Sequence, residues 1–255
     1  MYKLFPLLLL LLMLPFSVAL ATPLSDTVKK VKPAVVGVGV YDPTGRPQNQ
    51  LWGTGFVIGD GRYVVTNHHV IDGAVKASDN QQQVVFIGSG QAVDIRPAKV
   101  VAFSREHDLA ILAIRGNSLP ALKLASLALQ TEGNTIAFTG FPIGASLGLY
   151  PATHRGIISA ITPVVIPSNS STKLTPAMIK RLKNPYLVYQ LDAVAYPGNS
   201  GSPVYLQDSG EVIAIVNKVF VKKTKEAALS SPSGITYAIP VKYLYQLIEQ
   251  ARIDI

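Results

Sequence analysis

The sequence contains no cysteine, and this absence removes several classes of protein. The chain forms no disulfide and is not a lipoprotein anchored through an N-terminal cysteine, so a large buried core must stabilise the fold. Its four histidines include no His-x-x-x-His pair and no His-Glu-x-x-His motif, which argues against a zinc site. We therefore expect neither a metal nor a cofactor.

Charged residues are scarce, at 15% of the chain, and acidic residues are the rarer kind. The 23 Lys and Arg outnumber the 15 Asp and Glu, so the net charge is +8. The basic residues form three separated clusters, at 29–32, 180–183 and 222–223, without the interleaved aromatic residues that nucleic-acid binding favours. We interpret the clusters as solvated basic surfaces and expect no nucleic-acid partner; attraction to anionic substrates or to a membrane surface is the alternative.

A long hydrophobic run occurs at the N-terminus. Residues 1–21 combine Lys3, a leucine-rich core and the small-residue site Ala19-Leu-Ala21, which predicts a secretory signal peptide cleaved before Thr22. A retained membrane anchor is the alternative, because the run approaches the ~20 residues of a spanning helix, although two prolines and the cleavage site disfavour it. An exported chain without disulfides indicates a bacterial periplasm or secretion from a bacterium.

Short β-rich runs separated by Gly, Pro, Asn and Asp recur along the rest of the chain, for example at 84–87, 111–114, 135–138 and 212–216. This pattern predicts an all-β fold. About 230 residues are sufficient for one compact unit of two small barrels. Residues 117–133 are the predicted connection between them, and the apolar spacing after Pro240 predicts a short C-terminal amphipathic helix.

The segment Tyr196-Pro-Gly-Asn-Ser-Gly-Ser-Pro-Val204 places Ser200 between two glycines. Gly198 allows the backbone to turn its N–H groups toward one point, so we expect the amides of Gly198 and Ser200 to stabilise a developing oxyanion. A serine hydroxyl acts as a nucleophile only with a base and an orienting acid beside it. The rest of the chain must therefore supply a histidine and a carboxylate.

Two upstream segments supply these groups. His69 follows a hairpin pattern around Gly59-Asp-Gly61, and we expect it at the end of the second strand. On such a strand His68 and His69 point to opposite sides, so only one of them faces Ser200. Asp108 stands directly before an apolar run, where a strand is expected to begin.

The remaining histidines receive no catalytic role. His107 and His154 lack any partner at a spacing that specifies chemistry, and we interpret them as structural or exposed side chains.

The segments Thr66-Asn-His-His-Val70, Asp108-Leu-Ala-Ile-Leu112 and Gly198-Asn-Ser-Gly-Ser-Pro203 resemble, in this order, the three signature segments of trypsin-like serine proteases. The closest likeness is to the HtrA/Deg branch. Further similarity occurs at Val31-Lys-Pro-Ala-Val-Val36, Gly140-Phe-Pro-Ile-Gly144, Gly156-Ile-Ile-Ser-Ala160 and Gly234-Ile-Thr-Tyr-Ala-Ile-Pro240. The likeness therefore extends from about Val31 to Pro240.

The resemblance implies a protease domain at 22–255 with two six-stranded antiparallel β-barrels, at about 30–120 and 134–240. It implies that His69 takes the proton of Ser200 and returns it to the leaving amine, while Asp108 fixes the imidazole tautomer. The Thr-x-x-His pattern selects His69 rather than His68. Relatives often form trimers, but no segment of this sequence specifies an oligomeric state.

The resemblance places the base of the specificity pocket at Val194 and Ala195, with the opposite wall formed by Ile215, Val216 and Asn217. Such an apolar pocket favours small or medium aliphatic side chains at the cleavage site, because a Lys or Arg would bury an unpaired charge. Asp192 is out of register with a trypsin-like acidic pocket, and we interpret it as a local structural carboxylate.

The chain departs from the family pattern at three places. Ser202 replaces a glycine of most relatives, which restricts the backbone of the nucleophile loop. Asn199 replaces the aspartate that pairs with a newly cut N-terminus in digestive relatives, so we predict no activation by propeptide cleavage. The 15 residues after Pro240 leave no room for a PDZ domain, and we expect regulation within the protease domain or through a separate partner.

The leading hypothesis is an exported serine endopeptidase that hydrolyses unfolded or extended polypeptides through His69, Asp108 and Ser200. Its partners would be polypeptide substrates, with no stable membrane anchor after signal cleavage. The alternative is a non-catalytic protein that keeps the protease fold and binds exposed strands as a chaperone-like receptor.

Overall fold

The computed structural model describes residues 23–75, 81–90, 92–143, 148–164, 185–217 and 234–254. The predicted signal peptide at 1–21 and the basic clusters at 180–183 and 222–223 lie outside these ranges. Among the described residues, no helix has both the length and the hydropathy needed to cross a membrane.

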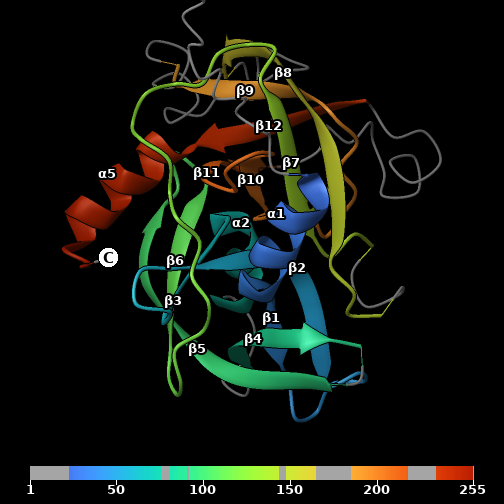
Figure 1. The fold of residues 1–255 in the computed structure, drawn as a ribbon. Coiled ribbons are helices and arrows are strands. Elements are labelled where there is room, and N and C mark those ends of the chain that lie inside the picture. The colour runs from blue at the N-terminus through green and yellow to red at the C-terminus, as the bar shows by residue number, and fades with distance from the viewer. Residues whose placement is uncertain are drawn as a thin grey trace, which may run out of the picture.

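Strands form two closed antiparallel barrels of six strands each, stacked one above the other (Figure 1). The first barrel has the strand order β1-β2-β3-β6-β5-β4. Its strands are β1 (Val35–Tyr41), β2 (Asn49–Ile58), β3 (Tyr63–Thr66), β4 (Gln82–Ser89), β5 (Ala92–Ser104) and β6 (Leu109–Ile114). This architecture confirms the predicted all-β class and the two six-stranded barrels.

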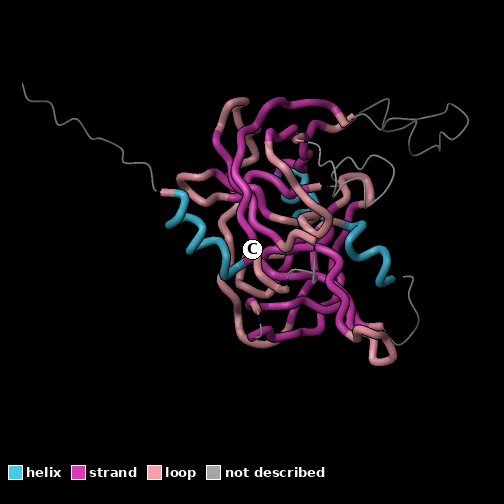
Figure 2. The backbone as a smooth tube through the Cα atoms, turned by 90° about the vertical axis from the view of Figure 1, so that its right-hand side faces the viewer, coloured by secondary structure: helices cyan, strands magenta, loops and turns pink. Residues whose placement is uncertain are grey.

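The second barrel has the order β10-β11-β12-β9-β8-β7. Its strands are β7 (Thr135–Gly140), β8 (Ala152–Pro163), β9 (Leu187–Asp192), β10 (Pro203–Leu206), β11 (Val212–Val216) and β12 (Ile235–Pro240). The chain between Ile114 and Thr135 connects the barrels, as the lack of a β-rich run there predicted. Figure 2 shows that strands account for most of the backbone in both barrels.

The predicted hairpin is the local structure that leads to His69. β2 and β3 pair antiparallel with Phe56 opposite Val65 and Ile58 opposite Tyr63. The turn between them uses Gly59 and Gly61 at positive φ angles of 62° and 87°, a backbone region that glycine adopts without strain. β6 begins at Leu109, directly after Asp108, as the apolar run predicted.

Short helices accompany the barrels in the part of the chain that the structure describes. They are α1 (Leu24–Val31), the short 3₁₀ helix η1 (Lys32–Ala34), α2 (His68–Val75) and α5 (Val241–Ala251). The C-terminal helix α5 was predicted from its apolar spacing, whereas α1 and α2 were not. The sequence pattern placed His68 and His69 at the end of an extended strand, and this expectation is wrong: β3 ends at Thr66, and both histidines lie in the first turn of α2.

Two hydrophobic clusters join the barrels to each other. The inter-barrel cluster combines residues of β2, β3 and β6, residues of β11 and β12, and α5: Phe56, Ile58, Val65, Leu109, Ile111, Val212, Ile215, Ile239, Val241, Tyr243, Leu244, Leu247 and Ile248. A smaller cluster packs Val31 of α1 and Val35 of β1 against Ala137, Phe141 and Tyr205 of the second barrel. These shared clusters hold the barrels in contact around the segments that carry His69, Asp108 and Ser200.

Candidate active site

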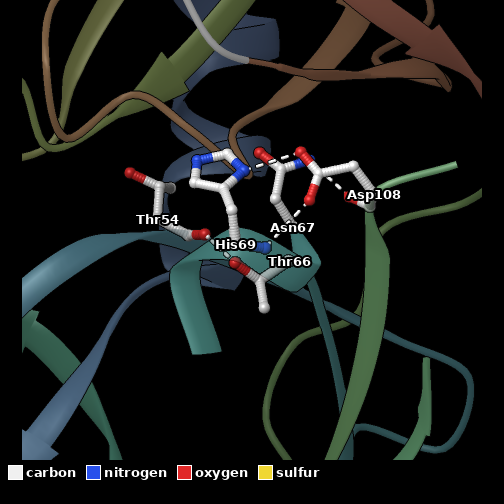
Figure 3. Close-up of polar contacts among 5 residues, drawn as sticks. All are labelled: Thr54, Thr66, Asn67, His69 and Asp108. Carbon is white, nitrogen blue, oxygen red and sulfur yellow. Dashed lines mark hydrogen bonds and ion pairs between the residues drawn. The ribbon is translucent and has the colours of Figure 1, made fainter. Parts of the chain in front are cut away.

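The structure brings His69 and Asp108 into a two-point contact. Oδ2 of Asp108 lies 2.6 Å from Nδ1 of His69, and the backbone N–H of His69 donates to Oδ1 of the same carboxylate over 2.8 Å (Figure 3). Both side chains are about four-fifths buried, with 23% and 21% of their surfaces exposed. The contact fixes the ring orientation, and it favours the tautomer that carries its proton on Nδ1 and leaves Nε2 as the acceptor.

Asp108 reaches this position through an uncommon backbone conformation. Its φ angle is +52°, in the left-handed region where aspartate is one of the few tolerated non-glycine residues. Its carbonyl oxygen accepts two hydrogen bonds, from the backbone N–H of His68 over 3.1 Å and from Nδ2 of Asn67 over 3.0 Å. Backbone and side chain of Asp108 therefore both hold the start of α2, and the strained residue is at the candidate site.

The loop that carries Ser200, called the nucleophile loop after the predicted role of that residue, is held through its carbonyl groups. Gly198 has a φ of +99°, and the carbonyls of Pro197 and Gly198 are both hydrogen-bonded, to Ile143 N–H over 2.6 Å and to Thr54 Oγ1 over 2.7 Å. Neither the N–H of Gly198 nor that of Ser200 donates a hydrogen bond to any described residue. Two amide donors two residues apart thus remain available for an anionic oxygen.

Gly201 allows this loop to approach the first barrel. Its φ is +87°, and an added Cβ would overlap the carbonyl oxygen of Thr54 and lie 2.5 Å from Oγ1 of Thr66. The carbonyl of Ser200, next to it, accepts a hydrogen bond from Thr54 N–H over 2.9 Å. Only glycine fits at position 201, because the nucleophile loop lies directly on the strands that lead to His69.

Ser200 itself is half-buried, and its hydroxyl makes no hydrogen bond to Nε2 of His69 among the described residues. The structure therefore forms the His69–Asp108 pair and brings the Ser200 backbone to the first barrel, but leaves the third contact open. Catalytic hydrogen bonds are often long without substrate and shorten when it binds.

The predicted specificity residues differ in their burial and in the cluster to which they belong. Ala195 and Val216 are buried in one cluster of the second barrel, together with Phe138, while Val194 and Asn217 are half-buried. The side chain of Ile215 is instead buried in the inter-barrel cluster, so the structure does not bring it together with the others. Two cavities among the described residues, of about 350 and 450 Å³, border residues 121–124 and contain none of the predicted site residues.

Two buried polar side chains lie on either side of Ser200 in the same loop. Asn199 and Ser202 are fully buried, and neither the side-chain amide of Asn199 nor Oγ of Ser202 has a partner among the described residues. Both side chains lie next to Gly140. A Cβ added there would overlap Oγ of Ser202 and lie 3.0 Å from Oδ1 of Asn199. The serine at position 202 is accommodated because β7 ends in a glycine.

The other histidines pack against aromatic rings. His68 lies 5.1 Å from Phe103, and burial lowers its pKa, with nearby Asp72 and Asp108 opposing this effect. His107 stacks on Tyr243 at 4.4 Å. His154 stacks on Phe138 at 4.8 Å, and burial lowers its pKa as well. Asp192 is exposed at the end of β9. No group of three or more potential metal ligands occurs in the described ranges.

Two residues that contact the nucleophile loop, Thr54 and Ile143, received no role from the sequence pattern. Thr54 lies on β2 in a Gly-Thr-Gly segment, and Ile143 follows β7 with a φ of +59°, a strained value for a β-branched residue. The glycines around Thr54 were the available signal, since they indicate close approach of another backbone. No feature of the residue pattern predicted the positive φ angle of Ile143.

Comparisons with known proteins identify the family of the chain. A family model for the trypsin-like peptidase domain matches residues 53–215. A DegP-like periplasmic serine endoprotease of Marinomonas sp. (strain MWYL1) is 30% identical over 220 residues, which are 85% of this chain and 39% of the relative. A relative of the same description from Halomonas elongata is 28% identical over 202 residues, covering 79% of this chain and 35% of its own length. The chain thus spans less than two fifths of these relatives.

Solved structures show the same fold. The serine endoprotease from Yersinia pestis is similar with a TM-score of 0.63 and 26% identity, over 91% of this chain and 67% of that one. The HtrA-type protease AlgW, solved with a tripeptide, is similar in fold with a TM-score of 0.65 and 24% identity, over 90% of this chain and 63% of that one. Because the family model covers more than half of the sequence, including His69, Asp108 and Ser200, the chain belongs to the trypsin-like peptidase domain family.

Proposed function

We propose that this protein is an exported serine endopeptidase that cleaves unfolded or extended polypeptides with His69, Asp108 and Ser200. The observation that carries the proposal is the pairing of an oriented imidazole with a loop that has two amide donors without a partner among the described residues. The His69–Asp108 contact of 2.6 Å orients the base, and the loop supports the acyl-transfer intermediate.

The proposed reaction proceeds through an acyl-enzyme. Ser200 Oγ attacks the carbonyl carbon of the substrate while His69 Nε2 takes the hydroxyl proton, and the amides of Gly198 and Ser200 stabilise the oxyanion. The intermediate then breaks its C–N bond as His69 protonates the leaving amine. A water molecule, deprotonated by His69, hydrolyses the ester and restores Ser200.

The substrate would lie as an extended strand beside the second barrel, with the residue at the cleavage site near Val194, Ala195 and Asn217. The buried Ala195 and Val216 support an apolar pocket, in which an aliphatic side chain is favoured over a charged one. We propose a preference for small or medium aliphatic residues. Competing cleavage of peptides that differ only at this position tests it: Val or Ala peptides should exceed Lys peptides by at least about a hundredfold.

The same relatives and residues support two further proposals, on the location of the protein and on its activation. The chain's relatives are described as periplasmic, and residues 1–21 fit a signal peptide, so we propose a periplasmic protein processed near Ala21. The neutral Asn199 supports activity without propeptide cleavage. N-terminal sequencing of the exported protein, together with activity before and after limited proteolysis, tests both proposals.

A fluorophosphonate probe tests the function directly. The purified protein and its Ser200→Ala variant are treated with the probe and, in parallel, with an unfolded protein substrate. We expect labelling and cleavage in the wild type only, with a loss on the order of 10⁴ or more in the variant. Cleavage that persists in Ser200→Ala would contradict the assignment.

One observation favours a second candidate, a non-catalytic protein that binds extended chains. Ser200 makes no hydrogen bond to His69 in the described structure, so the nucleophile is not in its activated arrangement. A well-folded wild type that resists the probe but binds unfolded polypeptide would support this candidate over the peptidase.

A further inference from the structure

Thr54 is a fully buried residue of the first barrel whose hydrogen bonds lead mainly to the second. Its N–H donates to the carbonyl of Ser200, and its hydroxyl donates to the carbonyl of Gly198 over 2.7 Å. The same hydroxyl oxygen accepts from the N–H of Phe141 over 3.0 Å. Its own carbonyl accepts from Oγ1 of Thr66 over 2.7 Å, as Figure 3 shows.

These bonds hold the peptide units next to those that contain the predicted oxyanion donors, the N–H groups of Gly198 and Ser200. In a trans peptide the C=O and the next N–H point in opposite directions. Ile143 holds the carbonyl of Pro197, so the N–H of Gly198 points away from Ile143. Thr54 holds the carbonyl on the other side of Gly198. Glycine has the least backbone restriction of any residue, so the angle between the two peptide units that meet at Gly198 depends on the bonds that hold them. Besides the bonds to Ile143 and Thr54, the N–H of Asn199 donates to the carbonyl of Tyr196 over 3.0 Å.

The hydroxyl of Thr54 is suited to this position because it has one proton to donate and lone pairs to accept. It uses the proton for Gly198 and a lone pair for Phe141, which joins the end of β7 to the nucleophile loop. Through Thr66, three residues before His69, the same residue is joined to the strand that leads to the base.

We propose that Thr54 is a positioning residue for catalysis: its hydroxyl holds the Gly198–Asn199 peptide, which lies between the two units that contain the oxyanion donors, and keeps those donors in register with His69. The inference rests on the proposed function. A Thr54→Val variant keeps the shape and the backbone bonds but removes the hydroxyl, whereas Thr54→Ser keeps the hydroxyl.

Thr139 provides a matched control. It is also a fully buried threonine on a strand, and its hydroxyl is within hydrogen-bond distance of Oγ1 of Thr153 and of the Tyr205 hydroxyl rather than of the loop. Thr139→Val therefore removes a buried hydroxyl that also has two hydrogen-bond partners, and it leaves the bond to Gly198 unchanged.

The test compares kcat and KM for a peptide substrate in the full chain and the three variants. Thr54→Val should lower kcat by about 10- to 100-fold with KM changed less than about threefold, because an oxyanion interaction is made in the transition state. Thr54→Ser and Thr139→Val should stay within about threefold of wild type. Equal losses in Thr54→Val and Thr139→Val would overturn the proposal, since they would show a general effect of core damage.

A measurement without turnover separates this inference from the proposed function. The backbone amide resonances of Phe141 and Gly198 are followed by NMR in the same proteins. Thr54→Val should shift both and speed hydrogen exchange at Phe141, while Thr139→Val should leave the Gly198 resonance in place. An unchanged Gly198 resonance in Thr54→Val overturns the positioning role even in an active enzyme.

If the wild type is inactive but Gly198 responds to Thr54→Val, the positioning role stands and the peptidase function fails. If Thr54→Val does not fold, Thr54→Cys replaces it, because a thiol is a weak donor of similar size. A kcat equal to that of the wild type in Thr54→Cys would then overturn the proposal.

Discussion

At the scale of single residues, the candidate site depends on backbone conformations that few residue types adopt. Asp108 at φ +52° and Gly201 at φ +87° bring a carboxylate to His69 and a loop onto Thr54. Each is a local departure from regular backbone, and each lies beside the strand or helix that carries a predicted catalytic group. Substitutions at these positions should therefore change activity more than their size suggests.

Gly201→Ala should unfold more easily than the wild type and lose activity. The added Cβ meets the Thr54 carbonyl, so we expect a cost of about 2–4 kcal/mol from left-handed strain and overpacking together. Gly133→Ala is the control: its φ is +88°, but nothing lies within 4 Å of the added Cβ, so only about 1 kcal/mol is expected. Urea unfolding of both variants measures the difference, and equal costs would contradict the close approach.

Asp108→Asn should lower kcat by about 10⁴ while the fold remains intact, since the amide cannot hold the imidazole in the required tautomer. The matched control is Asp192→Asn, an exposed carboxylate at the end of β9, which should remain within about twofold of wild type. Steady-state rates and thermal unfolding of both variants provide the measurement. Full activity in Asp108→Asn would exclude this carboxylate from the mechanism.

His154 should make the protein less stable in mild acid. Burial holds its pKa below the usual 6.5, so below pH 6.5 the unfolded chain binds a proton that the folded state does not. The contribution of the neutral His154 imidazole to the free energy of unfolding is complete above pH 6.5. It is lost as the pH falls through the lower folded-state pKa.

The free energy of unfolding, measured by urea between pH 7.5 and 5, should therefore fall less in His154→Gln and His154→Phe than in the wild type. The two variants share the loss of the titrating group and differ in packing on Phe138. An unchanged pH dependence in both would show that other groups determine acid stability.

At the scale of elements, α5 contributes to the core rather than merely ending the chain. Its apolar face joins strands of both barrels in the inter-barrel cluster, and Leu244 is fully buried there. The helix was predictable because five apolar residues recur on one face, but its contacts with β5 of the first barrel, far earlier in the chain, were not. Helix α2 escaped prediction because its eight residues, His68 to Val75, follow a strong β pattern without a break in composition.

Leu244→Ala should destabilise the protein by about 2–5 kcal/mol, the usual cost of a cavity at a fully buried leucine. Gln250→Ala on the exposed face of the same helix should change stability by less than about 0.5 kcal/mol. The midpoints and slopes of urea unfolding curves supply both values. A small loss in Leu244→Ala would mean that α5 does not pack against the barrels in solution.

At the scale of the whole molecule, the two barrels share their clusters and should unfold as one unit. Trp52 is the only tryptophan and packs against the core of the first barrel, so its fluorescence reports that barrel alone. Far-UV circular dichroism reports strands of both. The two signals should give the same urea midpoint. A tryptophan transition separated from the circular dichroism transition would show independent barrels.

The sequence by itself determined the β-strand pattern, the hairpin before His69, the amphipathic C-terminal helix and the types of residue at the candidate site. These features are local, because strand alternation, turn glycines and helix spacing act over a few residues. Only the tertiary structure decided that His69 begins a helix, that Asp108 adopts a left-handed conformation, and that Thr54 joins a loop 144 residues away. Such contacts exist only after both barrels have closed, since barrel closure sets the register that brings distant backbone groups within hydrogen-bond distance.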